Sequence, residues 1–438
     1  MTDISMNSIT PVATPKRRDI GLKGRYASER RFRIYGMLAI SVGLAFLAIM
    51  LVTIVSKGYT AFWQTTVTLP VTFDEKVIDP GNKRETDPNV LVRANYPKLA
   101  ENALIEKLGI DPANKPLVRE LKGFLSDGSR VQLRQILESD PSVLGQTRNV
   151  EILVAANLDS AFKGQIDLDV DESRRKVSDQ QVEWMNKLRA EGTMAEHFNK
   201  GLFTFGASSR PETSGMGVAI IGSFYMMIIV LILALPIGVA ASIYLEEFAK
   251  KNRLTDLIEV NINNLAAVPS IVYGLLGLAV FINFFGMPRS ASFVGGLVLT
   301  LMTLPTIIIA TRAALAAVPP SIRSAALGLG ASKMQMVFQH ILPLAAPGIL
   351  TGTIIGLARA LGETAPLLLI GMVAFVADYP ATPFDPATAL PVQIYMWANE
   401  AERAFVERLS GAIIILLMFL MAMNITAIVL RRRFERRW

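Results

Sequence analysis

The chain has 438 residues, of which 51% are hydrophobic and 18% are charged, and its apolar residues form long runs around one polar region. Soluble domains carry about 25% charged residues, and about 18 consecutive apolar residues suffice to cross a bilayer, so we predict an integral membrane protein. Cysteine is absent, which excludes disulfides, and only two histidines occur, which disfavours a histidine metal site. The net charge is +7, and the basic residues cluster at the edges of the predicted membrane spans, so membrane orientation explains them better than nucleic-acid binding does.

The N-terminal part combines a basic tail with an apolar run. Residues 1–33 are polar and basic, and the first apolar span follows at 34–56. This span is longer than the h-region of about 7–15 residues in signal peptides, and no small-x-small cleavage motif follows it. We interpret it as a retained transmembrane helix, with its N-terminus in the cytoplasm according to the positive-inside rule.

The polar region at 57–212 is long enough for a domain of its own, which we expect to be mixed but mainly helical. Its sequence predicts helices at 97–110, 129–139 and 180–203, and the alternation of apolar and polar residues predicts a strand at 164–172. No catalytic or metal-ligand pattern appears, so we expect no catalytic residue, metal or cofactor. The acidic run Asp167, Asp169, Asp171 and Glu172 lacks the glycine and terminal glutamate of a calcium loop, which favours solvated surface.

Five further apolar spans follow the polar region. They cover residues 216–245, 257–285, 293–316, 344–377 and 409–430. Basic residues gather at the N-terminus, in the two connections 246–256 and 317–343, and at the C-terminus, so six spans place both termini in the cytoplasm and 57–212 on the other side. The span at 344–377 is too long for one simple crossing, and we expect Pro347, Pro366 and its glycines to break it.

The connection before the fifth span carries a distinctive pattern. Its sequence from Ser324 to Pro343, "SAALGLGASKMQMVFQHILP", predicts two short helices joined at Gly330. Ile322, Ala325, Ala326 and Leu329 share one face at helical spacing. Small alanines permit close approach by another surface, and glycine permits a sharp turn. From these residues alone, a helical loop lying along the membrane remains an equal alternative.

This segment resembles the coupling loop of ABC importer permeases. The family pattern is Glu-Ala-Ala, three residues, Gly, nine residues, Ile, one residue, Leu-Pro, and the matching positions here are Ala325, Ala326, Gly330, Leu342 and Pro343. Ser324 stands where glutamate is usual and His340 where isoleucine is usual. The stretches "LPIGVAASIYLEEFA", "NNLAAVPSIVYGLLGLAVF" and "ARALGETAPLLLIG" are similar to the PstA-type phosphate permeases, and together these likenesses extend over roughly residues 200–435.

The resemblance implies an all-α type I ABC importer permease with six transmembrane helices, a core at 213–435 and a coupling loop at 317–343. The function it implies is import of inorganic phosphate across the bacterial inner membrane. No phosphate-binding loop of an ATPase occurs in the chain, so ATP hydrolysis would belong to separate ATP-binding subunits. The implied partners are those subunits, a second homologous permease of the PstC type, an extracytoplasmic phosphate-binding protein and membrane lipid, but no nucleic acid.

Three other functions remain open at this stage. A permease for molybdate or sulfate would keep the mechanism and change the substrate. A secondary transporter or channel would not need the coupling loop, and its transport would survive loss of ATP. A membrane enzyme or receptor would hold its site within 57–212, for which the resemblance implies no defined activity.

Two charges within the fifth apolar span mark a candidate substrate pathway. Arg359 and Glu363 are spaced i, i+4, and Thr364 follows. A charge at the bilayer centre costs about 2.5–3.5 kcal/mol, whereas an exposed pair at this spacing contributes only about 0.2–0.5 kcal/mol. One interpretation is a buried ion pair that fixes helix packing. The other, which the resemblance favours, is a route for an oxyanion, because the planar guanidinium suits phosphate.

Overall fold

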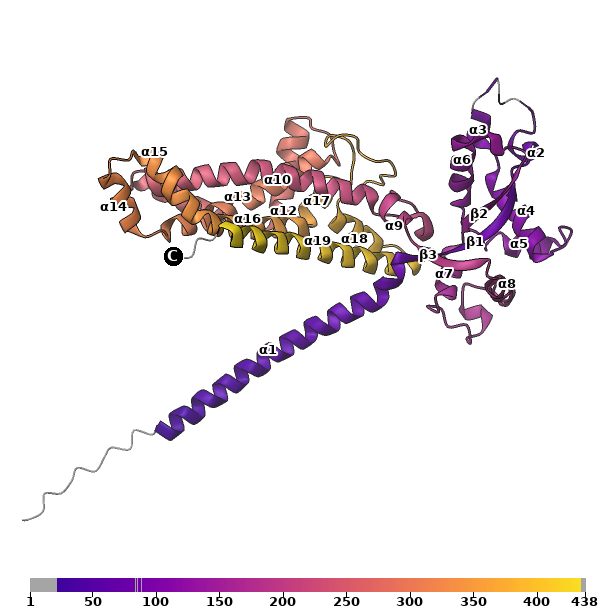
Figure 1. Ribbon diagram of the computed structural model, residues 1–438, viewed down its shortest axis with the longest axis horizontal. Coiled ribbons are helices and arrows are strands. Elements are labelled where there is room, and N and C mark those ends of the chain that lie inside the picture. The colour runs from indigo at the N-terminus through magenta and orange to yellow at the C-terminus, as the bar shows by residue number, and fades with distance from the viewer. Residues whose placement is uncertain (1–21, 83, 85, 88, 435–438) are drawn as a thin grey trace, which may run out of the picture. The chain divides into compact units, whose positions relative to one another are not determined.

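A computed structural model describes residues 22–82, 84, 86–87 and 89–434 (Figure 1). The chain divides into two compact units, Met1–Thr53 and Ile54–Trp438. In the first unit the predicted basic tail lies outside the described residues up to position 21. Helix α1 (Leu22–Gly58) contains the predicted span 34–56 and extends beyond it at both ends, past the boundary between the units.

The second unit begins with a small sheet and short helices that occupy the polar region. In chain order they are η1 (Tyr59–Phe62), β1 (Trp63–Thr72), α2 (Glu75–Ile78), α3 (Asn89–Arg93), α4 (Tyr96–Leu108), α5 (Lys115–Leu121), α6 (Ser129–Ser139), η2 (Pro141–Val143), β2 (Thr147–Leu153), α7 (Ala156–Phe162), η3 (Glu172–Arg174), α8 (Asp179–Ala190), β3 (Met194–Phe198), α9 (Gly201–Thr204) and η4 (Pro211–Thr213). The strand order is β2–β1–β3, and both pairings are antiparallel.

Strand β1 organises this region because it is the central strand. Its first half pairs with β3, and Thr66 to Thr72 pair with β2. Pro70 lies beyond the part of β1 that pairs with β3, which ends at Val67, so the missing N–H of this proline removes no hydrogen bond between β1 and β3. The inward residues Val67, Leu69 and Val71 are fully buried in one core with α4, α6 and α8.

Two predictions for this region are wrong. No strand forms at 164–172, because aspartate side chains bond to nearby backbone: the Asp169 N–H donates to Asp167 at 3.0 Å and the Ser173 N–H to Asp171 at 3.0 Å. Such turns compete with strand pairing. The helix predicted at 180–203 ends at Ala190, and the chain then pairs as β3 with β1, a contact that local periodicity does not show. The acidic run itself is exposed, as expected.

The remaining chain forms the apolar helices. They are α10 (Gly217–Ile243), η5 (Tyr244–Phe248), α11 (Arg253–Ala266), α12 (Ser270–Gly277), η6 (Leu278–Phe284), α13 (Ser292–Ala316), α14 (Pro320–Gly328), α15 (Lys333–Gln335), η7 (Met336–Ile341), α16 (Leu342–Gly362), α17 (Ala365–Leu369), α18 (Leu390–Ala398) and α19 (Ala404–Phe434), with η5, η6 and η7 being π-helical turns. Among the described residues, five helices are long and apolar enough to cross a membrane, and a bent pair would make a sixth span.

The span predicted at 257–285 forms as this bent pair of helices. Helices α11 and α12–η6 meet at an angle of 100°. Pro269 caps α12 and cannot continue α11, and the Tyr273 hydroxyl donates to the Leu265 carbonyl at 2.7 Å, which satisfies one carbonyl that the ending helix leaves free.

The fifth span is broken, as expected, but at only one of the two predicted prolines. A continuous helical stretch runs from Lys333 to Gly362 and then stops. Pro347 lies inside α16 without ending it, whereas the chain breaks at Glu363, whose backbone is extended, and Pro366 lies in the first turn of the short helix α17. The segment between α17 and α19 contains one more helix, α18.

Helices α13 and α16 pack closely because small residues face each other. A Cβ added at Gly348 would lie 2.6 Å from the Ala314 Cβ, and one at Gly352 would lie 2.2 Å from the Ala310 Cβ. Membrane helices that lack a strong hydrophobic driving force associate through such small-residue contacts. Helix α13 also packs along α10, and α16 along α19, so these four helices form one bundle (Figure 1).

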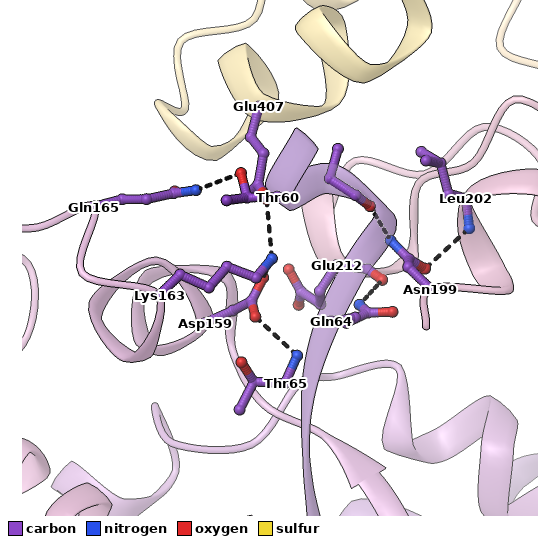
Figure 2. A network of polar contacts seen from close by, with 11 residues as sticks. Thr60, Gln64, Thr65, Asp159, Lys163, Gln165, Asn199, Leu202, Glu212 and Glu407 are labelled. Carbon is purple, nitrogen blue, oxygen red and sulfur yellow. Dashed lines mark hydrogen bonds and ion pairs between the residues drawn. The ribbon is translucent and has the colours of Figure 1, made fainter. Parts of the chain in front are cut away.

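Buried ion pairs join the polar region to the beginning of α19 (Figure 2). The Lys163 Nζ lies 2.8 Å from Asp159 and 2.9 Å from Glu407, and all three side chains are less than a tenth exposed. Asp159 also accepts the Thr65 N–H of β1 at 2.9 Å. The cluster therefore ties β1, α7 and α19 together.

A third acid, Glu212, lies beside this cluster. Glu212 is 5% exposed, accepts the Ser126 hydroxyl at 2.8 Å, and its carbonyl accepts the Gln64 amide at 2.6 Å. Burial raises the pKa of the Glu212 carboxyl above its ordinary value, although the Ser126 hydrogen bond acts in the opposite direction. The Arg408 guanidinium is buried nearby on α19.

Candidate functional site

The coupling-loop segment has the predicted helix–turn–helix shape. Helix α14 begins at Pro320, a residue suited to a first helical turn, and ends at Gly328. The Ala331 N–H then donates to the Ala326 carbonyl, and the Gly330 N–H to the Leu327 carbonyl, which together form a Schellman cap. Gly330 has φ +88°, so glycine is needed here for backbone conformation, and an added Cβ would meet no neighbour within this chain.

The residues predicted to form one apolar face of this segment differ in burial. Ala326 is buried at 7% exposure and packs with Met336, Val337 and Ile341, whereas Leu329 is 90% exposed. The reason is that Leu329 lies just past the last residue of α14, where the chain turns away. Ser324, Ala325, Gly330 and Pro343 are exposed, and Leu342 is half-buried. The segment therefore presents both small and large apolar side chains that its own chain leaves uncovered.

Arg359 and Glu363 lie at the C-terminal end of α16. The Arg359 Nε is 3.6 Å from the Glu363 Oε1, and the two side chains are 46% and 20% exposed. Thr364 follows as the N-cap of α17, partly exposed, without a capping hydrogen bond from its side chain. The three predicted residues are thus together, at the point where the fifth apolar helix breaks.

Helix α12 forms a wall of this site. A Cβ added at Gly274 would lie 2.6 Å from the Pro366 Cα, so α12 and α17 are in direct backbone contact. The buried Tyr273, whose hydroxyl closes the 100° bend, is within electrostatic reach of Arg359. The bend in the third apolar segment therefore places α12 beside the break in the fifth.

Other charged residues near the coupling segment carry no obvious sequence signal. Arg312 of α13 lies 3.4 Å from Glu246 and 3.1 Å from Glu259, which come from η5 and α11. Arg323 of α14 lies 2.9 Å from Glu247. The Arg312–Glu246 and Arg323–Glu247 pairs are 66 and 76 residues apart in the sequence, so only the folded chain brings them together. Over the ranges that the structure describes, no group of three metal-ligating side chains is found.

Comparisons with known proteins agree with this geometry. Residues 234–438 match the family "Binding-protein-dependent transport system inner membrane component", and residues 19–172 match a domain of unknown function, DUF3333. The "Phosphate transport system permease protein PstA" of Xylella fastidiosa is 31% identical over 235 residues, covering 53% of this chain and 80% of that protein. The "Probable ABC transporter permease protein YqgI" of Bacillus subtilis is 33% identical over 193 residues, covering 41% of this chain and 65% of that protein.

A solved structure of the MetNI methionine ABC transporter in an inward-facing conformation covers 50% of this chain and 98% of its own, with 17% identity and a TM-score of 0.42. The family match at residues 234–438 includes the coupling segment and the Arg359–Glu363 pair. The chain is therefore a mainly helical, multi-pass inner-membrane protein whose apolar part has the type I permease fold, and it belongs to the PstA-type permeases of ABC importers.

Proposed function

We propose that this chain is one half of the membrane pathway of an ATP-driven importer of inorganic phosphate. The choice of phosphate as substrate rests on the 31% identity to a phosphate transport permease over 80% of that protein's length. The exposed Ser324, Ala325 and Leu329 of the coupling segment support docking of a separate ATP-binding subunit, because their own chain leaves them uncovered. A second homologous permease, of the PstC type, would supply the other half.

Arg359, Glu363 and Thr364 are the proposed pathway residues. Nearly half of the Arg359 side chain is accessible in the single chain, and its separation from Glu363 is longer than a hydrogen bond. A guanidinium that its own carboxylate holds loosely can exchange that partner for a phosphate oxygen, with which it forms bidentate bonds. Glu363 would neutralise Arg359 again after the anion leaves, so the anion is bound only transiently.

The proposed orientation places both termini and the coupling segment in the cytoplasm. Basic residues end α19 at Arg431, Arg432 and Arg433, which supports a cytoplasmic C-terminus. Residues 57–212 then lie outside the cytoplasm, on the side from which a phosphate-binding protein would deliver its ligand.

Transport by the intact complex tests this function. Cells, or right-side-out vesicles loaded with ATP, that contain the chain with its native partners should take up labelled phosphate only when ATP is available inside, and unlabelled phosphate should compete better than molybdate or sulfate. Stronger competition by molybdate or sulfate would show that the substrate is another oxyanion, transported by the same ATP-driven mechanism. Uptake that persists after ATP is removed would instead indicate a secondary transporter or channel and refute the proposal.

A further inference from the structure

One arginine connects the coupling segment to two other elements. Arg323 lies in the first turn of α14. Its Nη2 donates to the Leu315 carbonyl at 2.8 Å, in the last turn of α13, and its Nη1 to the Val318 carbonyl at 2.6 Å, just after that helix. Its Nη2 and Nε also donate to the Glu247 carboxylate at 2.9 and 3.2 Å. The guanidinium is thus bonded in three directions.

Glu247 brings the end of the first bundle helix into this arrangement. It lies in η5, the π-helical turn that continues α10, and its side chain is only 7% exposed. The adjacent Glu246 faces a different cation, Arg312. Within the described residues, Arg323 is therefore the cation that balances Glu247, and removal of either partner leaves a largely buried charge without its counterpart.

The other contact of α14 with the bundle is apolar. Ala326 is the one residue of α14 that is buried, and it packs on Met336, Val337 and Ile341 of η7, which leads into α16. The partly buried Ile322 also packs against this cluster, and a nine-residue helix held only by these two apolar side chains retains freedom to tilt relative to the helices behind it. The Arg323 bonds remove that freedom, because they fix the first turn of α14 to both α10 and α13.

We infer that Arg323 is a positioning residue that transmits displacement of the coupling segment to α10 and α13, with Glu247 as its receiving partner. This inference rests on the proposed function, in which an ATP-binding subunit docks on the segment. Displacement then reaches the bundle by two routes: an apolar route through Ala326 and η7 into α16, and a polar route through Arg323 and η5 into α10. Both routes enter the bundle at a π-helical turn, a form often found at functional sites.

The chemistry of arginine suits this role. Its planar guanidinium satisfies two carbonyls and one carboxylate at fixed angles, whereas the lysine ammonium is a compact charge on a flexible stem. Arg323→Lys should therefore keep the charge balance at Glu247 but not the connection to the Leu315 and Val318 carbonyls, and its coupling should fall between those of the natural chain and Arg323→Gln.

The test uses the purified complex with its ATP-binding subunits, reconstituted in proteoliposomes with the phosphate-binding protein. Three quantities are measured for each variant: the amount of ATP-binding subunit retained, the rate of ATP hydrolysis, and the phosphate imported per ATP hydrolysed. Arg323→Gln and Glu247→Gln should both retain the subunits and hydrolyse ATP. Phosphate per ATP should fall about tenfold, within the range of 5–150-fold typical of coupling between sites.

Two further variants complete the test. The exchange Arg323→Glu with Glu247→Arg should restore part of the coupling that Arg323→Glu alone removes. Lys76→Gln, which changes an exposed cation of the polar region outside the coupling segment, should leave phosphate per ATP unchanged. Unchanged phosphate per ATP in Arg323→Gln, or a decrease that only follows loss of the ATP-binding subunits, would overturn the role of Arg323. An unmodified chain that retains no such subunit would instead refute the proposed function.

Discussion

Two ion pairs in this chain share the same i, i+4 spacing but differ in their surroundings. Lys163 and Asp159 are 2.8 Å apart with side chains 2% and 6% exposed, and Glu407 completes the group. Arg359 and Glu363 are 3.6 Å apart with side chains 46% and 20% exposed. The spacing is therefore not what decides the role of such a pair. A buried pair must be kept intact, because each charge depends on its partner, whereas an accessible pair can exchange its partner for a ligand.

The largest expected effect on stability is in the buried group. Lys163→Met removes the cation between Asp159 and Glu407, and the cost should be about 3–5 kcal/mol in the free energy of unfolding, because two carboxylates are left buried without it. Denaturant unfolding in detergent, followed by the fluorescence of the native tryptophans, measures this change.

A matched control lies in the same part of the chain. Lys107 forms a 3.0 Å pair with Glu191, but the two side chains are 30% and 36% exposed. Lys107→Met should cost no more than about 1 kcal/mol, as is typical of accessible pairs. Equal costs for the two methionine variants would show that burial does not distinguish these pairs.

Glu212 should produce a smaller, pH-dependent effect. Its pKa is raised in the folded chain, chiefly by burial, so the folded state binds the proton more tightly than the unfolded state does. The stability that this group contributes is present at low pH and is lost as pH rises above the unfolded value, by about 1.4 kcal/mol for each unit of pKa difference. Glu212→Gln, which keeps an acceptor for Ser126, should therefore gain stability relative to the natural chain at neutral pH.

The pH profile of unfolding provides the measurement. The difference between Glu212→Gln and the natural chain should vanish in acid, where both side chains are neutral. A constant difference across the whole profile would show that Glu212 acts through packing rather than through its proton.

The smallest effect on stability, but a large one on transport, is expected at the accessible pair. Arg359→Met with Glu363→Leu should change the free energy of unfolding by no more than about 1 kcal/mol. Phosphate uptake per assembled complex should nevertheless be lost, because the anion no longer meets a guanidinium. Arg359→Lys should retain partial uptake at best, since it keeps the charge but not the planar fork. Near-normal uptake by the double variant would show that the pair is structural.

Local patterns in the sequence were sufficient for many elements. The helix at 129–139 has the bounds of α6, since Leu133 and Leu137 lie one turn apart on its buried face. The turn at Gly330 and the closeness of Arg359 to Glu363 were visible because both depend on residues only a few positions apart.

Features that depend on distant residues could not be predicted in this way. Strand β3 was expected to be helical because its pairing partner β1 lies about 130 positions earlier, beyond any local period. The 100° bend had a visible signal in Pro269, but continuous hydropathy around it favoured one straight span. The Arg323–Glu247 and Lys163–Glu407 pairs have no signal in sequence spacing, because only the completed fold brings them together.

The separation between Lys163 and Glu407 has a consequence for biosynthesis. Glu407 is made 244 residues after Lys163, which corresponds to about 10–50 s of translation at 5–20 residues per second. During that interval Lys163 has Asp159 but not its second carboxylate. This ion-pair cluster is therefore complete only after α19 has been made, and a chain truncated before α19 leaves Lys163 with one of its two carboxylates.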